Sequence, residues 1–435
     1  MNFQQSSIFS ALASFGLLFI NLFTSMIIAR LLGPEQIGRY QVFVTTQTFI
    51  STICALGIGQ SCIYFINALK YKERKVLSTS INSTFPIAVL VSIILFLLII
   101  FIPGYFGQVD SICLLLFCMG TTAMLLNNIF TPVLLVNLEV VRNQIVKYSS
   151  ALLTLLVLVG VLLLEIKLTV DFLIAMLGAT TIISTIILYY FFRDRFRLMD
   201  GIDFKLLRNI IKWGVKLSGN NIASITLASV PIYFLTWFSL SDGLLNVGYY
   251  SRAVAALVVG TVLAASIGPL LYSKWSTVSG EQLKNQVKRA SMLFILVNVT
   301  IALLLMILAP FLIVLMYGEE FRYAIPLLQI LALSLVANSI KEICYSILSS
   351  QGKPLKILKN LLIGIIFCAV LNYFLIPYWG AVAVAIVTTI TSFMTAFLLI
   401  RDVTLISVIE TRDFFTMPKR RDVLNILSNI LKIKK

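Results

Sequence analysis

The chain has 435 residues, of which 59% are hydrophobic and 12% are charged. In soluble globular proteins roughly half of the residues are hydrophobic and roughly a quarter are charged. This composition excludes a soluble globular protein and favours a membrane protein with many spans. The chain has no histidine, which excludes imidazole metal ligands and histidine-based general base catalysis, so we expect no metal site and no hydrolase triad.

Charge-free stretches long enough to cross a bilayer recur along the whole chain. A hydrocarbon core about 30 Å thick needs about 20 apolar residues in a helix. The stretches are residues 8–29, 40–69, 76–109, 111–138, 148–164, 172–192, 217–241, 253–273, 290–318, 323–340 and 360–400. The last is too long for one span and contains turn residues at Ile376–Gly380, so we divide it there and predict twelve helices. The first has no basic segment before it and no cleavage site after it, so we expect a retained span and not a signal peptide.

A short polar interruption between the first two apolar stretches, Ala29–Tyr40, has an echo at Leu245–Ser251. Placing Gly38 on Gly248 aligns Tyr40 with Tyr250 and requires a shift of 210 residues, close to half the chain. We therefore predict two copies of one unit with six helices each. Because six is even, the two lobes are parallel repeats related by an axis along the membrane normal.

Lys and Arg collect in alternate loops. These loops are 70–75, 142–147, 193–212, 274–289 and 353–359, together with the tail from Arg401 onward. Residues 103–110, 239–246 and 377–380, in the other set of loops, contain no Lys or Arg. Cytoplasmic loops carry the excess of Lys and Arg, so we predict that both termini are cytoplasmic and that the protein lies in the plasma (inner) membrane. The basic charge then indicates topology, and no nucleic-acid partner is expected.

The predicted domains follow from this topology. Residues 1–195 form an N-terminal lobe with helices 1 to 6, 196–212 a cytoplasmic linker, and 213–401 a C-terminal lobe with helices 7 to 12. Residues 402–435 form a basic tail in which apolar residues recur at helical spacing, so we expect a cytoplasmic amphipathic helix on the membrane surface.

A few charged residues fall deep in the apolar stretches. Lys216, Arg252 and Lys341 lie about 12–18 Å along their predicted helices at 1.5 Å per residue. A charge at that depth is costly against lipid, so we expect these side chains to face a hydrated cavity or a partner. Arg30 and Arg39 flank the outer end of the first helical hairpin. Their long side chains can extend to the membrane–water interface, and this explains their presence as well as a function does.

Other polar residues at similar depth leave two interpretations open. Glu342 either pairs with a basic residue of another helix or couples transport to a cation or proton. The pairs Asn127–Asn128 and Asn220–Asn221, with Asn338, offer hydrogen bonds between helices, for which packing is the default explanation. Aromatic residues that could stack on sugars, or simply pack, are Tyr40, Tyr64, Tyr249, Tyr250 and Tyr345.

Several short motifs, in order along the chain, carry a resemblance to a known family. They are Ile28–Tyr40, Leu56–Gly59, Met316–Phe321, Ala324–Leu331, Leu348–Lys353 and Asn372–Gly380. Together they resemble the bacterial polysaccharide flippases, which translocate O-antigen and capsule repeat units and belong to the multidrug/oligosaccharidyl-lipid/polysaccharide exporter superfamily. The resemblance spans essentially the entire chain.

The resemblance implies an all-α bundle of two six-helix lobes around a central cavity, which opens alternately to each side. It implies transport of undecaprenyl-diphosphate-linked oligosaccharides from the cytoplasmic to the outer leaflet, for O-antigen, lipopolysaccharide or similar polysaccharide biosynthesis. Its partners would be that substrate, membrane lipids and other polysaccharide assembly proteins. No enzyme activity and no cofactor are implied, although a proton or sodium gradient can drive such transport.

Cationic cavities are typical of this family, which fits the independently found deep cations. The candidate substrate-binding residues are therefore Arg252, Lys341, Lys216, Arg30 and Arg39, and Glu342 is the candidate for ion coupling. A diphosphate needs such cationic partners.

Two alternatives remain. A cation or drug antiporter of the same superfamily would share the architecture but would want acidic or neutral cavity groups. A membrane polysaccharide polymerase or ligase would present a sizeable outer loop with clustered catalytic residues, and every predicted outer loop is short.

Overall fold

The computed structural model describes residues 3–102, 106, 109–136, 139–196, 201–239, 242–275, 277–278 and 280–415. These residues form helices and no strand. The helices are α1 (Phe3–Cys54), α2 (Ile58–Ile63), a π-helix (Tyr64–Ala68), α3 (Glu73–Phe101), α5 (Ser111–Val136), α6 (Val140–Leu163), α7 (Val170–Phe192), α8 (Phe204–Phe238), α9 (Gly243–Trp275), α10 (Gly280–Tyr317), a 3-10 turn (Glu319–Phe321), α11 (Ala324–Ala332), α12 (Ser334–Ser350), α13 (Pro354–Thr404) and α14 (Thr411–Phe415). The predicted amphipathic tail falls mostly on residues 416–435, outside the described residues.

The membrane-spanning helices agree with the predicted class. Nine helical segments of the described chain are long and apolar enough to cross a membrane. Two of them, α1 and α13, contain two crossings each, because they bend at Gly33 (φ 74°, ψ 172°) and Gly380 (φ 52°, ψ −127°), in backbone conformations open only to glycine. Since α9, with 33 residues, is also of spanning length, the described ranges confirm the predicted twelve helices of a multi-pass, all-α membrane protein.

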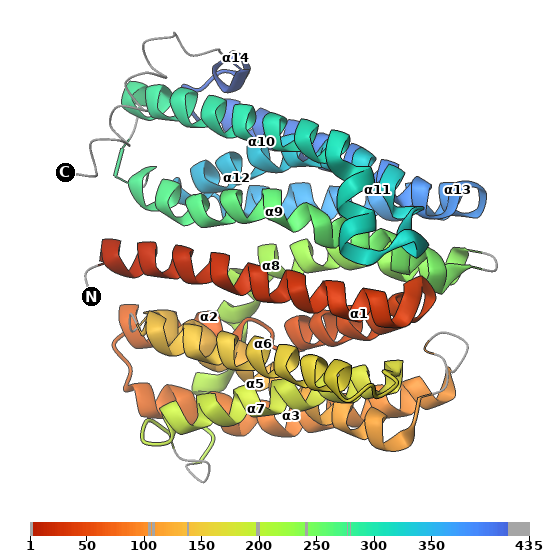
Figure 1. Ribbon diagram of the computed structural model, residues 1–435. Coiled ribbons are helices and arrows are strands. Elements are labelled where there is room, and N and C mark those ends of the chain that lie inside the picture. The colour runs from red at the N-terminus through yellow and green to blue at the C-terminus, as the bar shows by residue number, and fades with distance from the viewer. Residues whose placement is uncertain are drawn as a thin grey trace.

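The helices run roughly parallel to one another and form two lobes. Figure 1 shows α3, α5, α6 and α7 on one side of α1, and α9, α10, α12 and α13 on the other. The long contact between α8 and α13 assigns α8 to the second lobe. The predicted boundaries of the lobes and linker stay predictions, and the described helices on either side of the linker end at Phe192 and begin at Phe204.

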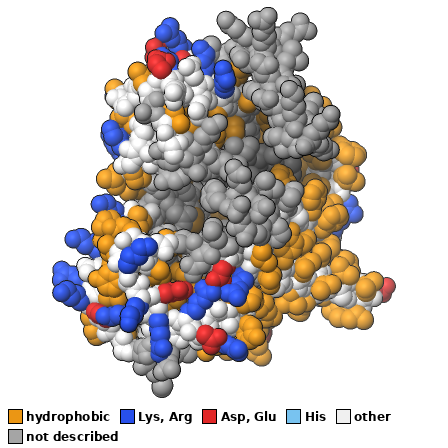
Figure 2. All heavy atoms as spheres, turned by 90° about the vertical axis from the view of Figure 1, so that its left-hand side faces the viewer, with side chains coloured by type: hydrophobic (Ala, Val, Ile, Leu, Met, Phe, Trp, Pro, Cys, Tyr) orange, Lys and Arg blue, Asp and Glu red, His pale blue; other side chains and the backbone are white. Residues whose placement is uncertain are grey.

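The two ends of the bundle differ. The start of α1, the connection from α7 to α8 and the start of α10 lie at the left-hand end in Figure 1, and the bends of α1 and α13 lie at the opposite end. Figure 2 shows that Lys and Arg side chains are spread over both lobes at the left-hand end. We call this the basic end, and the other, after its two bends, the kink end.

Hydrophobic packing joins the lobes at the kink end. One cluster of buried side chains there contains residues of both lobes, among them Ile28 and Ile37 of α1 and Val247 and Ala253 of α9. Towards the basic end the buried side chains form separate clusters, one built mainly on the N-terminal lobe and one on the C-terminal lobe. The lobes are therefore closed against each other at the kink end.

The glycines of the sequence echo meet each other in this closed region. A Cβ atom on Gly38 would lie 1.7 Å from the carbonyl oxygen of Leu244, and one on Gly248 would lie 1.8 Å from that of Pro34. Any side chain at either position would force α1 and α9 apart. The repeat thus places a small residue of each lobe at the same interface.

Two predicted helices are not continuous. The stretch 40–69 was expected as one helix, but it breaks between Cys54 and Ile58, where Leu56 (φ 47°) and Gly57 (φ 65°) are left-handed. The stretch 323–340 belongs to one span, Ala324–Ser350, which is interrupted at Leu333, where α11 and α12 meet. Apolar composition does not reveal such breaks, because the chain remains charge-free across them.

Candidate functional site

The C-terminal lobe contains a cavity of about 540 Å³. Its walls come from α8, α9, α10, α11, α12 and α13, and Gln41 of α1 contributes from the N-terminal lobe. Its polar lining consists of Gln41, Ser224, Tyr250, Ser251, Asn298, Ser334, Asn338, Lys341, Glu342, Tyr345, Thr388 and Ser392. A volume of this size, with apolar walls and a limited set of polar groups, is typical of ligand pockets.

Lys341 and Glu342 place both signs of charge in this cavity. Both lie on α12, and the Lys341 Nζ is 3.5 Å from the Ser392 Oγ on α13. Among the described residues, no basic side chain forms an ion pair with Glu342. The alternative that Glu342 pairs with another helix is therefore not realised in the described part of the chain.

Arg252 lies between the two lobes beside the cavity. Its side chain is only 7% exposed, and one terminal nitrogen donates a 2.6 Å hydrogen bond to the Ser25 Oγ of α1. The other terminal nitrogen is 3.5 Å from the Gln41 Oε1, and the guanidinium lies 5.8 Å from the centre of the Tyr317 ring. Its Nε has no hydrogen-bond partner and no described carboxylate forms an ion pair with it, so Arg252 is a buried cation held by neutral groups.

Arg30 and Arg39 lie at the kink end rather than in the cavity. Arg30 is exposed and donates to the carbonyl of Leu315 in the last turn of α10, where the helix dipole favours a cation. The Arg39 Nε donates a 3.1 Å hydrogen bond to the carbonyl of Phe106, and its guanidinium lies 3.5 Å from the Asp171 carboxylate. Arg30 therefore connects the lobes, and Arg39 contacts residues of its own lobe.

Lys216 is exposed on α8 and does not line the cavity. Its ammonium lies 5.1 Å from the centre of the Trp213 ring, and Trp213 in turn stacks on Tyr64 at 4.6 Å. The structure therefore brings Lys341 and Glu342 together, places Arg252 at the edge of the same cavity, and leaves Lys216, Arg30 and Arg39 elsewhere. All five cations stay predicted binding residues.

Sequence reasoning did not find the polar neighbours of these charges. Ser25, Gln41 and Ser392 touch Arg252 or Lys341, but single neutral residues in apolar stretches carry no distinctive pattern. Of the tyrosines considered for sugar stacking, Tyr250 and Tyr345 line the cavity. The Tyr250 hydroxyl also lies 3.2 Å from the Thr388 hydroxyl, so it has a structural role as well.

The two-lobed helical bundle is the fold of known transporters. The lipid II flippase MurJ in an inward closed conformation superposes with a TM-score of 0.76 at 14% identity, over 98% of this chain and 96% of that one. An inward-facing multidrug resistance MATE family transporter of the MOP superfamily gives 0.66 at 15% identity, over 88% and 92%. A MOP superfamily transporter from Pyrococcus furiosus with reversed polarity of its binding pocket gives 0.62 at 15% identity, over 90% and 92%. The chain therefore shares the fold of these proteins.

The family is shown by sequence. The model of the polysaccharide biosynthesis protein family matches residues 4–272, and the MatE model matches residues 279–374. The first match covers more than half of the chain, so the chain belongs to the polysaccharide biosynthesis protein family.

Curated relatives match only in part. The succinoglycan biosynthesis transport protein ExoT of Rhizobium meliloti is 25% identical over 337 residues, which are 75% of this chain and 64% of the relative. An uncharacterized membrane protein of Methanocaldococcus jannaschii, MJ1068, is 24% identical over 188 residues, which are 42% of this chain and 37% of the relative. The chain therefore spans less than two thirds of either relative.

Proposed function

We propose that the protein is a flippase that moves undecaprenyl-diphosphate-linked oligosaccharide repeat units of a surface polysaccharide across the plasma membrane. Transport would run from the cytoplasmic to the outer leaflet, by alternating access of the two lobes. Family membership, the ExoT relative named for succinoglycan transport and the MurJ-like fold support this proposal. They favour transport over an enzyme reaction.

The observation that carries the proposal is the buried guanidinium of Arg252. A buried cation that is held only by neutral groups is costly, and an anionic ligand would offset that cost. A diphosphate supplies several acceptor oxygens for a guanidinium fork. Gln41 both lines the cavity and contacts Arg252, so a diphosphate in the cavity would need only a local side-chain movement to reach it.

The cavity suits the sugars of such a substrate. Hydroxyl and amide side chains such as Asn298 and Asn338 can bond sugar hydroxyls, and Tyr250 and Tyr345 offer aromatic surface. The prenyl chain would stay in the lipid between the lobes, because it gains nothing by entering a polar cavity. Opening at the kink end would then release the sugars.

The proposed orientation places the basic end in the cytoplasm. Lys and Arg are spread over that end in both lobes, and cytoplasmic faces of membrane proteins carry this excess. The kink end, where the lobes are closed against each other, would then face outward. In this arrangement the described conformation is shut towards the outside.

The test is a polysaccharide assay in a strain that lacks the native protein. Arg252→Ala should abolish surface polysaccharide while normal amounts of protein reach the membrane, and Arg252→Lys should restore part of it. Arg208→Ala is the matched control, because Arg208 is exposed on α8, away from the cavity, and should leave polymer at the wild-type level. Normal polymer in Arg252→Ala would overturn the assignment.

Glu342 supports a second proposal, coupling to an ion gradient. It is the acid that lines the cavity, and no described basic residue forms an ion pair with it. Glu342→Gln should change the pH or sodium dependence of transport. Unchanged dependence on both would contradict a coupling role.

The alternative function is a cation or drug antiporter, for which Glu342 would supply the acidic cavity group. Lys341 in the same cavity opposes this, because it would repel a cationic drug. A deletion strain should therefore lose surface polymer without gaining drug susceptibility. Gain of susceptibility with normal polymer would favour the antiporter.

A further inference from the structure

A second, smaller cavity lies between the lobes. It measures about 150 Å³ and is bounded by the break between α1 and α2, by α5 and by α8. Its polar lining consists of Thr52, Gln60, Asn128, Thr131, Ser218 and Asn221. Asn128 and Asn221 belong to the two asparagine pairs that the sequence places at mid-membrane depth, and the fold brings one member of each to this cavity.

The polar side chains of this lining are uncharged, and most of them make no hydrogen bond within the described protein. Ser218 donates to the carbonyl of Gly214 at 2.8 Å, and the Asn128 amide donates to the carbonyl of Ser51 at 3.1 Å, which leaves the Asn128 Oδ1 open. In the described part of the chain, the side chains of Thr52, Gln60, Thr131 and Asn221 have no hydrogen-bond partner. At this depth such groups are costly against lipid and call for a polar ligand or water.

The helix break adds a backbone acceptor on one side. The amide of Leu56 bonds to the carbonyl of Ile53 at 3.1 Å, and the amide of Ile58 bonds to that of Ala55 at 2.9 Å, each three residues back. The carbonyl of Thr52, a residue that lines the cavity, therefore loses the amide that a regular helix would supply. The C-terminus of α1 and the N-terminus of α2 both lie at this break, so their helix dipoles oppose each other, and it is the oxygen ligands that favour a cation.

The donor set decides which cation fits. Divalent Mg²⁺ and Ca²⁺ are held in proteins by carboxylates, and none of the lining residues carries one. Neutral oxygens from side chains and an unwound helix are the ligands by which membrane transporters bind Na⁺. The cavity is also far smaller than the one in the C-terminal lobe, so a lipid-linked oligosaccharide would not fit.

We infer that this cavity binds a monovalent cation, Na⁺, through Thr52, Asn128, Thr131 and Asn221. Asn221 is exposed, so an ion can enter from the space beside α8. The ligands come from α1 and α5 of one lobe and from α8 of the other. Affinity for the ion therefore depends on how the lobes are arranged, and Na⁺ holds α8 against α1 and α5.

Its role in transport rests on the proposed function, whereas binding itself does not. If the lobes separate along α8 during transport, the ion leaves with that movement, and a sodium gradient biases the cycle. Sodium binding can be measured on the purified protein without any lipid-linked sugar. Sodium binding can therefore be absent although the protein is a flippase, and it can be present although the transported substrate is not a lipid-linked oligosaccharide.

The experiment measures binding of radioactive sodium to the full-length protein in lipid nanodiscs, with thermal unfolding in NaCl, KCl and choline chloride at equal ionic strength. We expect saturable sodium binding and a higher Tm in NaCl than in choline chloride. Thr131→Val removes a hydroxyl and keeps the shape, and Asn221→Ala trims an exposed side chain. Each should weaken sodium affinity at least tenfold while the Tm in choline chloride stays near the wild-type value.

One control separates the site from general effects. Thr300→Val alters a hydroxyl on the exposed face of α10, so it should bind sodium as the wild type does. Equal Tm in NaCl and choline chloride, with no saturable sodium binding, would show a cavity that holds water only and would overturn the inference. Sodium binding that persists in both cavity variants, or that is weakened equally in Thr300→Val, would also overturn it.

Discussion

The two lobes repeat one architecture but differ inside. In the N-terminal lobe, α5 and α7 pack backbone to backbone, and a Cβ atom on Gly120 would lie 2.4 Å from the Cα of Gly178. In the C-terminal lobe, the equivalent helices α12 and α13 are separated enough to hold Lys341 beside Ser392 and to border a cavity of about 540 Å³. Glycines thus allow close helix packing in the N-terminal lobe, whereas the equivalent helices of the C-terminal lobe border a cavity with polar side chains.

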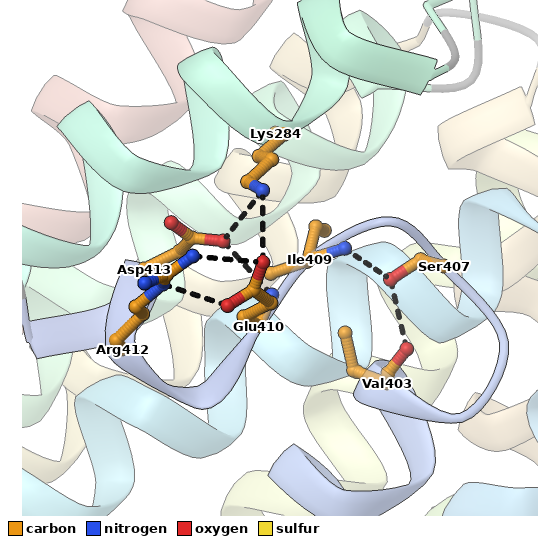
Figure 3. A network of polar contacts seen from close by, with 7 residues as sticks. All are labelled: Lys284, Val403, Ser407, Ile409, Glu410, Arg412 and Asp413. Carbon is orange, nitrogen blue, oxygen red and sulfur yellow. Dashed lines mark hydrogen bonds and ion pairs between the residues drawn. The ribbon is translucent and has the colours of Figure 1, made fainter.

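The lobes also differ in how their basic ends are held. In the N-terminal lobe, Arg195 bridges Glu139 of the α6 start and Glu73 of the α3 start, and Lys75 of α3 pairs with Asp203 at the start of α8, the first helix of the other lobe. In the C-terminal lobe, Lys284 of α10 pairs with Glu410 and Asp413 after α13, as Figure 3 shows. We infer that the N-terminal lobe serves as a packed support and that the C-terminal lobe carries most of the binding chemistry.

The largest expected effect comes from the contact that joins the lobes. Gly248→Leu places a side chain where the carbonyl of Pro34 lies, so the kink end cannot close. We expect loss of surface polysaccharide with protein still present in the membrane. Gly160→Leu is the control, because nothing lies within 4 Å of a Cβ atom there, and polymer should be unchanged. Wild-type polymer in Gly248→Leu would show that this contact is not needed.

The next effect tests whether the chemistry resides in one lobe. Lys341→Met removes the cavity ammonium with little change in volume, and we expect a loss of at least tenfold in transport rate (about 1.4 kcal/mol). The exposed Lys147→Met in the N-terminal lobe should cost less than threefold. An in vivo polymer assay normalised to membrane protein measures both variants. Equal losses in the two would remove the distinction between the lobes.

A smaller effect concerns the basic end of the C-terminal lobe. Asp413 is 3% exposed and pairs with Lys284 at 3.6 Å, so Lys284→Ala leaves a buried carboxylate without that partner. We expect a loss of about 1–3 kcal/mol in stability, measured by thermal unfolding in detergent. The double variant Lys284→Ala/Asp413→Asn should recover part of it, because no buried charge is left. Equal stability of Lys284→Ala and wild type would mean that the pair is not stabilising.

The smallest effect is a pH dependence at the start of α8. The Asp203 carboxylate accepts a hydrogen bond from Lys75 and another from the amide of Leu206, and these lower its pKa. Because the folded pKa lies below the unfolded value of about 3.9, the stabilisation is complete above that value and is lost as the pH falls through the folded pKa. Hydrogen exchange of the first turn of α8, corrected for intrinsic rates, should therefore rise in acid.

The control is built into the chain. Asp203→Asn keeps a capping side chain but cannot titrate, so its exchange should follow the corrected intrinsic rates at every pH. The start of α7 is capped by Thr169, which accepts from the amide of Phe172 and is also uncharged, so it should behave like Asp203→Asn. The same acid-dependent rise at both helices would assign the effect to global unfolding.

Much of the fold could be predicted from the sequence, because its causes are local. Apolar stretches of spanning length defined the helices, and Gly33–Pro34 and the turn residues Ile376–Gly380 marked the two bends. The break at Leu56 (φ 47°) could not be foreseen from the sequence, because it accompanies a close contact in the fold: an added Cβ on Gly57 would lie 2.4 Å from the carbonyl oxygen of Gly214. Tertiary contacts of this kind leave no local signal.

The candidate site was less predictable than the fold, because depth along a helix does not fix direction. Lys216, Arg252 and Lys341 were expected at comparable depths, yet Lys216 is exposed, Arg252 lies between the lobes, and Lys341 faces the cavity of one lobe. Which way each points depends on the rotation of its helix against its neighbours. The echo of Gly38 in Gly248 did carry tertiary information, since the two glycines share one interface.

The apolar cluster that joins the lobes at the kink end also sets how temperature acts on the protein. Ile28, Ile37, Val247 and Ala253 lie in this cluster, and opening the kink end to water would expose part of that surface. Exposure of apolar surface carries a positive heat-capacity change, and the hydrophobic contribution weakens on cooling. Cold should therefore shift the population of conformers towards the state open at the kink end.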